Sequence, residues 1–271
     1  MEAFAPTSVK PPTTPRFAVR LAGSSGHELA VEGYWRPVIN VAEACQRGWA
    51  LSLRVRTPGG DGAPRAISLD SLNAVDRERV NVAAVRHGLD ALPDGAGHTP
   101  AYVAILPVAW TCAKSDRARR ELLRMAGRAR AWRHVIPIAE IVGMDAGAPG
   151  AAIVEATASL KPIFGAVLAG LATVGDDVPR LMDKGFTGAS LDAGGLEISP
   201  DRPILSGVVA LLKAVGPTVM LQDINAVAAL EAAHDAGVAW ASLDLTRGGW
   251  HLLNVGLEAL KVRAAERPGR G

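Results

Sequence analysis

TGASLD, residues 187–192, is echoed by WASLD at residues 240–244. Each is a short apolar run of strand length that ends on an aspartate and follows a helix-like segment closed by Gly185 or Gly237. A helix, a glycine stop, a buried strand and a carboxylate form one unit of an α/β barrel or a doubly wound sheet. Barrels carry their chemistry where strands end, so Asp192 is a candidate site residue. Aspartate is also a favoured cap, and we interpret Asp244 as one.

Similar units follow one another through the second half of the chain. Strand-like runs begin at residues 101, 135, 165, 187, 218 and 239. This spacing suits alternating strands and helices, and the runs are apolar on both faces, as parallel strands covered by helices are. We therefore predict a TIM-like α/β barrel, with a doubly wound open sheet as the alternative. No GxGxxG motif follows the first strand, so a dinucleotide-binding fold has no support.

The first hundred residues break this regularity. Residues 1–16 are rich in proline and threonine, and we expect a disordered tail there, followed by a single domain over residues 17–271. Arg47-Gly48 suggests a turn between two extended segments. Extended structure is expected at residues 17–22, 28–37 and 50–56.

Helix and strand ends are predicted from local signals. A helix is expected from Ser71 to about Leu92, capped by Ser71 or Asp70. Pro107 is expected to end the strand that begins at residue 101. TRGG at residues 246–249 is interpreted as a plain turn in preference to a phosphate-binding nest.

Composition excludes several classes of protein. The 271 residues are 49% hydrophobic and 21% charged, which is typical of a soluble globular domain with a large core. A net charge of +2 gives no reason to expect nucleic acid, and the basic residues 114–133 are interpreted as the solvated face of a helix. Cys45 and Cys112 form no CxxC motif, which argues against a disulfide scaffold or a zinc site. No apolar run is long enough to span a membrane and no signal pattern opens the chain, so we expect a cytoplasmic protein.

Residues 28–57, ELAVEGYWRPVINVAEACQRGWALSLRVRT, resemble the opening of EAL-type cyclic di-GMP phosphodiesterase domains. In those domains a strand reading like YQPIVD leads through a short hairpin to EALLRW. Here the two segments read YWRPVIN and ALSLRVR. The resemblance extends loosely over residues 28–250 and rests on order and spacing more than on identity. It implies a modified TIM barrel with an early antiparallel hairpin.

The resemblance also implies a chemistry, metal-assisted phosphodiester hydrolysis, in which carboxylates and an asparagine hold two divalent ions. The signature glutamate of the family corresponds to Ala50, and the arginine after it to Arg54. The metal-binding asparagine falls near Pro107. The glutamate of the following strand falls on Pro137 or Glu140, depending on a shift of three residues.

The remaining ligand positions are poor in acids. The paired aspartates of the family fall in residues 167–175, which contain no carboxylate. The lysine and aspartate of the next strand fall on Ser190 and Asp192, and two further glutamates fall on Gln222 and Asn225. Amides carry no charge to offset two divalent ions. The resemblance therefore implies a barrel that has lost the family's hydrolysis, with no bound metal and no cofactor.

Two functions remain open from the sequence. The favoured one is a catalytically inactive EAL-like module in cyclic di-GMP-linked signalling, with a protein partner, weak affinity at most for a cyclic dinucleotide, and oligomerisation left open. The alternative is a TIM-barrel enzyme, a metal-dependent phosphodiesterase or lyase, with a site of Glu140, Asp192, Asp223 and Asp244. No activated nucleophile or complete ligand set supports the enzyme. The candidate ligand-binding residues are Arg54, Glu140, Asp192, Gln222 and Asp223.

Overall fold

The computed structural model describes residues 16–59, 63–92, 102–133, 135–175, 177–193 and 202–265. Apart from Arg16, the tail expected at residues 1–16 lies outside this range. The strands are β1 (Phe17–Ala22), β2 (Glu28–Asn40), β3 (Cys45–Pro58), β4 (Pro64–Ile67), β5 (Tyr102–Ala109), β6 (Val135–Val142), β7 (Ala166–Leu171), β8 (Gly188–Asp192), β9 (Thr218–Ile224) and β10 (Trp240–Leu243).

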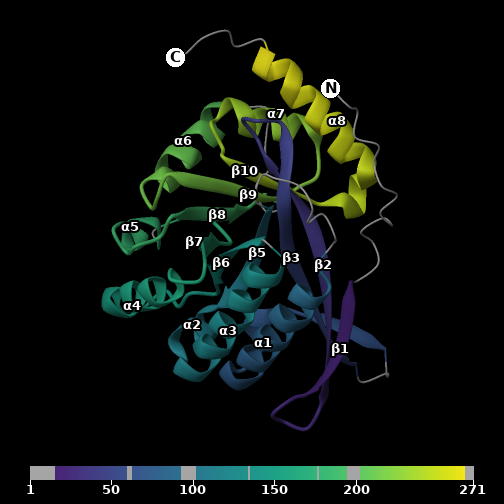
Figure 1. The fold of residues 1–271 in the computed structure, drawn as a ribbon, viewed down its shortest axis with the longest axis vertical. Coiled ribbons are helices and arrows are strands. Elements are labelled where there is room, and N and C mark those ends of the chain that lie inside the picture. The colour runs from purple at the N-terminus through teal and green to yellow at the C-terminus, as the bar shows by residue number, and fades with distance from the viewer. Residues whose placement is uncertain are drawn as a thin grey trace.

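The helices cover the outside of the sheet (Figure 1). They are a 3-10 turn η1 (Leu69–Ser71), α1 (Ala74–Asp90), α2 (Trp110–Lys114), α3 (Asp116–Arg133), α4 (Gly150–Leu160), α5 (Asp177–Leu181), α6 (Arg202–Lys213), α7 (Val227–Asp235) and α8 (Leu245–Ala265). None of these described helices is long and apolar enough to cross a membrane.

The sheet closes into an eight-stranded barrel. Its order is β1-β2-β10-β9-β8-β7-β6-β5-β3-β4, and a further pairing of β2 with β3 joins the ends of the central eight strands. Strand β2 is antiparallel to both β3 and β10, whereas β3 and β5 to β10 run parallel to one another. The predicted TIM-like barrel with an early antiparallel hairpin is confirmed, and the open sheet is excluded.

The hairpin of β2 and β3 continues beyond the barrel, where β1 and β4 pair with its outer edges (Figure 1). Helix α1 covers this extension. Its Val80 and Ala84 pack against Leu29 and Val31 of β2 and Val55 of β3 in one buried cluster. The loop between β1 and β2 also contacts α1. Asp76 of α1 accepts hydrogen bonds from the backbone N–H and the hydroxyl of Ser24 in this loop, at 2.8 Å each.

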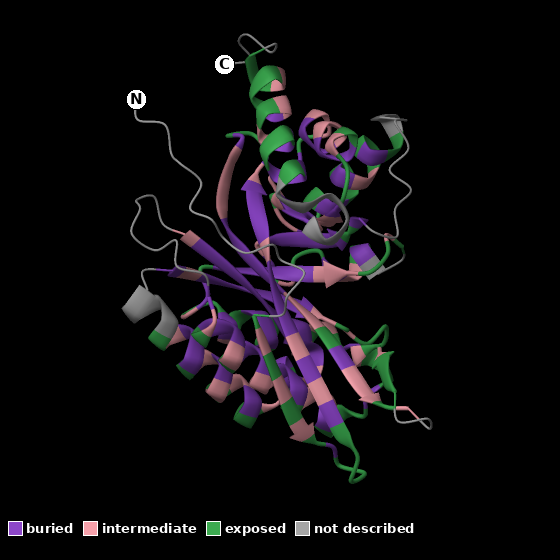
Figure 2. Ribbon diagram, turned by 90° about the vertical axis from the view of Figure 1, so that its right-hand side faces the viewer, coloured by how far each residue is buried: buried purple, intermediate pink, exposed green. Residues whose placement is uncertain are grey.

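Side-chain alternation separates two apolar layers, which Figure 2 shows as nearly continuous burial along the barrel strands. Residues such as Trp49, Leu106 and Val167 face outward and pack against helices. Their neighbours face inward and fill the barrel with Val38, Ala50, Val103, Ile105, Ile138, Ala166, Leu168 and Met220. Because successive side chains of a strand point to opposite faces, both layers follow from the same apolar runs.

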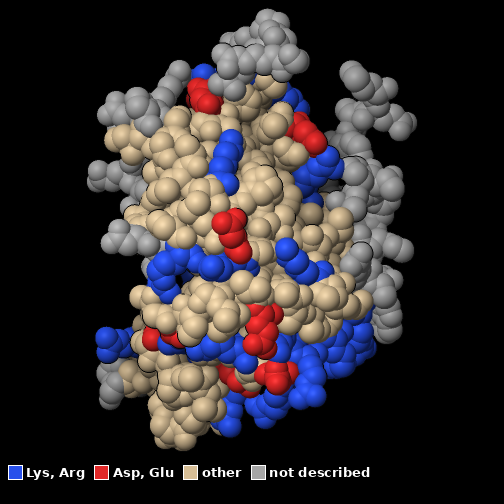
Figure 3. All heavy atoms as spheres, turned by 90° about the vertical axis from the view of Figure 1, so that its left-hand side faces the viewer, with Lys and Arg blue, Asp and Glu red and all other residues tan. Residues whose placement is uncertain are grey.

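Helix α3 carries the basic segment of the chain. Arginine and lysine side chains gather over the lower part of the face in Figure 3, with acids among them. On α3, Arg117 pairs with Glu78 of α1 at 3.1 Å and Arg124 pairs with Glu121 at 2.8 Å, and Arg86 of α1 also pairs with Glu121 at 2.8 Å. These exposed pairs fit the interpretation of a solvated helix face.

Four local predictions were wrong, at the turn between β2 and β3, at residues 246–249, at the cap of α1 and at Pro107. The turn between β2 and β3 lies at residues 41–44, and Arg47 and Gly48 are inside β3. Gly48 is needed there because a Cβ would lie 2.0 Å from the carbonyl oxygen of Val103 on β5. The TRGG segment at residues 246–249 is helical, at the start of α8, and is not a connecting turn. Helix α1 is capped by Asn73 rather than by Ser71 or Asp70.

Pro107 does not end β5, which continues to Ala109. The side chain of Asn81 on α1 lies beside this segment. Its Nδ2 donates to the Pro107 carbonyl at 2.7 Å, and its Oδ1 accepts from the Ala109 backbone N–H at 3.1 Å. Both bonds are buried, so Asn81 satisfies backbone groups that have no access to water.

We predict that Asn81→Ala lowers the free energy of unfolding by about 2–4 kcal/mol, because each buried polar group left unpaired costs roughly 1–3 kcal/mol. Urea denaturation followed by circular dichroism measures this loss. Val75→Ala is the matched control, because Val75 lies on the same helix with 53% of its surface exposed. Equal stability of the two variants would contradict the proposed role of Asn81.

Candidate functional site

A cavity of about 420 Å³ lies at the end of the barrel where the parallel strands terminate. The floor of the cavity can be derived from strand alternation. A residue two positions along a strand from a residue of the apolar interior layer also points into the barrel. On six strands these residues are Arg36, Ser52, Pro107, Glu140, Gly170 and Gln222, and all of them line the cavity. The barrel mouth therefore carries a layer of mostly polar side chains directly above an apolar core.

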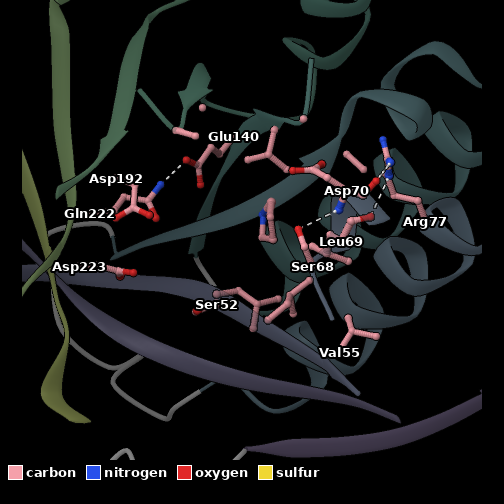
Figure 4. Close-up of a pocket in the computed structure, with 18 of the residues that line it drawn as sticks. Ser52, Val55, Ser68, Leu69, Asp70, Arg77, Glu140, Asp192, Gln222 and Asp223 are labelled. Atoms are coloured by element: carbon pink, nitrogen blue, oxygen red, sulfur yellow. Dashed lines mark hydrogen bonds between the residues drawn. The ribbon is translucent and has the colours of Figure 1, made fainter. Parts of the chain in front are cut away.

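Segments outside the barrel form the wall of this cavity. Ser68, Leu69 and Asp70, at and before η1, face the mouth from the side opposite Gln222 (Figure 4). Arg77 of α1 holds this wall by donating hydrogen bonds to the backbone carbonyls of Leu69, Asp70 and Leu72 at 2.8–3.1 Å. A second hollow of about 250 Å³ adjoins the cavity and shares Asp70 and Gly170 with it.

Glu140 on β6 is the most enclosed acid of the mouth, with 6% of its surface exposed. The hydroxyl of Ser190 donates to its Oε1 at 2.5 Å. The amide of Gln222 donates to the same oxygen, as the dashed line in Figure 4 shows. Burial raises the pKa of Glu140 and the nearby charge of Asp192 adds to the rise, while the two hydrogen bonds oppose it. Glu140 thus sits in an environment that favours its neutral form.

A β-bulge in β9 brings two consecutive side chains to the cavity. Leu221 pairs with Ala241 and Ile224 pairs with Leu243, so β9 has one residue more than β10 across this step. Asp223 takes up the extra residue with φ of +61°, a backbone conformation that aspartate tolerates better than most residues. As a result, Gln222 and Asp223 both line the cavity, although strand alternation would have separated them.

Arg36 on β2 enters the mouth between the acids. Its guanidinium forms an ion pair with Asp223, and the two side chains are only 17% and 28% exposed. Burial lowers the pKa of Arg36, whereas attraction to Asp244 and Asp192 raises it and repulsion from Arg54 lowers it. Sequence reasoning missed Arg36. The signal was a single charge in the apolar strand YWRPVIN, two residues from the inward-facing Val38.

The structure brings most of the predicted ligand-binding residues together. Glu140, Asp192, Gln222 and Asp223 line the same cavity, and Glu140 rather than Pro137 supplies the side chain of β6. Arg54 lies apart from this group, exposed on β3, with its guanidinium 4.8 Å from the centre of the Tyr34 ring. Four of the five candidates therefore form one cluster, and the fifth lies on the antiparallel extension.

Ala50, the position of the signature glutamate, lies one layer below the cavity among the apolar side chains of the interior. Leu51, Ser52, Leu53 and Val55 of β3 line the cavity, and Ser52 is the polar one among them, with a hydroxyl instead of a carboxylate. Pro107 and Gly170 occupy the corresponding positions of β5 and β7 and offer no side-chain donor. Strands β3, β5 and β7 thus bring no charge to this layer of the mouth.

No family model and no curated protein sequence matches this chain. Solved structures do match. The Bacillus subtilis YkuI protein, with an EAL domain and bound to cyclic di-GMP and calcium, aligns with a TM-score of 0.62 and 12% identity over 87% of this chain. This chain spans 62% of the length of that protein.

Two further EAL structures align over most of both chains. An EAL domain protein from Listeria monocytogenes aligns with a TM-score of 0.57 and 11% identity, over 88% of this chain and 93% of the other. The Xanthomonas citri FimX EAL domain, in complex with cyclic di-GMP, aligns with a TM-score of 0.54 and 14% identity, over 81% and 87%. The chain has the fold of EAL domains, as the opening hairpin indicated.

The divalent ions implied by that resemblance do not fit the mouth of this barrel. Among the described residues, no three His, Cys, Asp or Glu side chains are grouped so that they could hold a metal ion. Hard cations need several oxygen ligands, preferably charged. Here Glu140 Oε1 accepts two hydrogen bonds, and Asp223 is paired with the fixed charge of Arg36.

We predict that Glu140→Gln makes the domain more stable relative to the wild type as pH rises above the ordinary glutamate value of 4.5. A carboxyl whose pKa is raised by folding stabilises the folded state below the unfolded pKa and loses that contribution as pH rises through the folded pKa. Glutamine keeps a carbonyl oxygen that can accept from Ser190 and Gln222. Urea denaturation of both proteins from pH 4 to pH 8 measures the difference, and a difference that shrinks with pH would contradict the assignment.

Proposed function

We propose that this chain is a regulatory domain of cyclic di-GMP-linked signalling that does not hydrolyse the dinucleotide and acts by binding a protein partner. The link to cyclic di-GMP is supported by the fold, because EAL structures similar to this chain include complexes with that dinucleotide. The absence of hydrolysis and the role of a partner are inferred from the mouth and the surface of this chain.

The observation that carries the proposal is the ion pair of Arg36 and Asp223 in the barrel mouth. Metal-assisted hydrolysis needs a concentrated negative charge that holds divalent ions and lowers the pKa of a bound water. In this mouth one carboxylate is neutralised by a guanidinium and another, Glu140, has its pKa raised by burial. What remains cannot compensate two divalent ions.

The charge of the cavity also disfavours phosphate groups. Its lining contains four acids and two bases, and both bases are already engaged, Arg36 with Asp223 and Arg77 with three backbone carbonyls. For its polar contacts a dinucleotide would therefore depend on Arg54, which lies outside the cavity lining, and on uncharged groups such as the amide of Gln222. Each missing charge-assisted contact costs about 1.5–3 kcal/mol, so we propose that affinity for the dinucleotide is weak.

A protein partner is supported by the surface of α6. Ile204 and Leu211 are 68% and 40% exposed and lie seven residues apart, so they share one face of the helix. No charged residue lies between them in the sequence. The upper half of the face in Figure 3 is mostly uncharged. Exposed apolar side chains on one helix face are what a protein-binding surface on α6 would use.

We predict no hydrolysis of cyclic di-GMP above a protein-free blank in the presence of Mg²⁺ or Mn²⁺. The reaction is followed by chromatographic separation of the linear and cyclic dinucleotides. The phosphodiesterase domain of PaMucR, a structural neighbour with bound cyclic di-GMP, serves as the positive control in the same buffers. Turnover by this chain that disappears in Asp192→Ala would contradict the proposal, because it would place hydrolysis in the mouth described above.

A further inference from the structure

The cluster around Arg36 joins four strands of the barrel. Arg36 comes from β2, whereas Asp192, Asp223 and Asp244 come from the carboxyl ends of β8, β9 and β10. Asp223 pairs with the guanidinium directly, and the other two attract it electrostatically. Arg36 is thus a cation, covalently part of the barrel, that acids of three neighbouring strands attract.

The direction of β2 explains why a side chain can take this place. Val38 pairs with Ser242 of β10, and β2 runs against β10, so Arg36 lies beyond the end of that strand, level with Asp244. The parallel strands have their carboxyl ends at the mouth. Strand β2 runs the other way, so the residues that lie at the mouth are those that precede its inward-facing Val38. The long side chain then extends across the mouth toward the bulge at Asp223.

Neighbouring carboxylates repel one another, and a cation among them offsets that repulsion. Other barrels can meet this need with bound divalent ions. Here the guanidinium has the required sign and position, and 83% of its side-chain surface is removed from solvent, as follows from the 17% that is exposed.

We propose that Arg36 is the resident cation of the barrel mouth: it takes the electrostatic place of a bound divalent ion and makes the folded barrel independent of metal. The inference concerns the stability and metal response of the mouth. It holds whether the partner of the domain is a protein or a nucleotide, and it fails independently of the hydrolysis assay.

The test compares thermal unfolding of four proteins with EDTA and with about 5 mM CaCl₂. The proteins are wild type, Arg36→Met, Arg54→Met and Arg36→Met/Asp223→Asn. Arg54→Met is the matched control, because it removes the same charge from the adjacent strand β3, where the guanidinium lies over Tyr34. Asp223→Asn removes one carboxylate and keeps a residue type that tolerates positive φ.

For wild type and Arg54→Met we expect equal melting temperatures in the two buffers. Arg36→Met should melt lower than both in EDTA and rise by roughly 3–6 °C with Ca²⁺, a shift that corresponds to about a tenfold change in the unfolding equilibrium. The double variant should recover part of the stability lost in Arg36→Met and respond less to Ca²⁺, because one repelling carboxylate is gone.

Two results would overturn the inference. One is a wild-type protein that Ca²⁺ stabilises as strongly as it stabilises Arg36→Met. The other is an Arg36→Met variant whose melting temperature equals that of the wild type in EDTA. If Arg36→Met does not fold, the double variant decides: folding restored by Asp223→Asn supports the resident cation, and failure to restore it contradicts the inference.

Discussion

The structure depends on one pairing constraint, namely that β2 must hydrogen-bond along both of its edges. It pairs with β3 on one side and with β10 on the other, antiparallel in both cases, and this closes the sheet into a barrel. A strand that runs against its neighbours reverses which of its residues reach the mouth. The closure of the barrel and the presence of Arg36 among the acids therefore have a common cause.

Because of that arrangement, the mouth has less free negative charge than a site that binds divalent ions needs. Arg36 neutralises Asp223, and Ser190 and Gln222 hydrogen-bond to Glu140 in a place where burial favours its protonated form. Polar groups that pair with one another in a partly buried site leave fewer oxygens for an added ion. This balance of charge supports the proposed regulatory role more than the cleavage of a phosphodiester.

The fold could be predicted from the sequence because strands that are buried on both faces require continuous apolar runs. Apolar runs of strand length, separated by helices and glycine stops, specify parallel strands buried on both faces, and the hairpin before them explained the irregular start. Strand ends were predicted less well at Pro107, because Asn81 lies 26 residues earlier in the chain and its contribution is a tertiary contact. Of the site, the inward acids Glu140 and Asp192 were found by position. The pairing of Arg36 with Asp223 depends on strand direction and on a bulge, and neither is visible in local sequence.

The central claim is that a guanidinium, and not a metal ion, neutralises the barrel mouth. The most direct measurement is anomalous X-ray scattering from crystals of the protein grown with cyclic di-GMP and MnCl₂. The account predicts no manganese peak within the mouth and electron density for the Arg36 guanidinium beside the carboxylate of Asp223. A manganese peak bound by Glu140, Asp192 or Asp223, with Arg36 displaced from them, would contradict it.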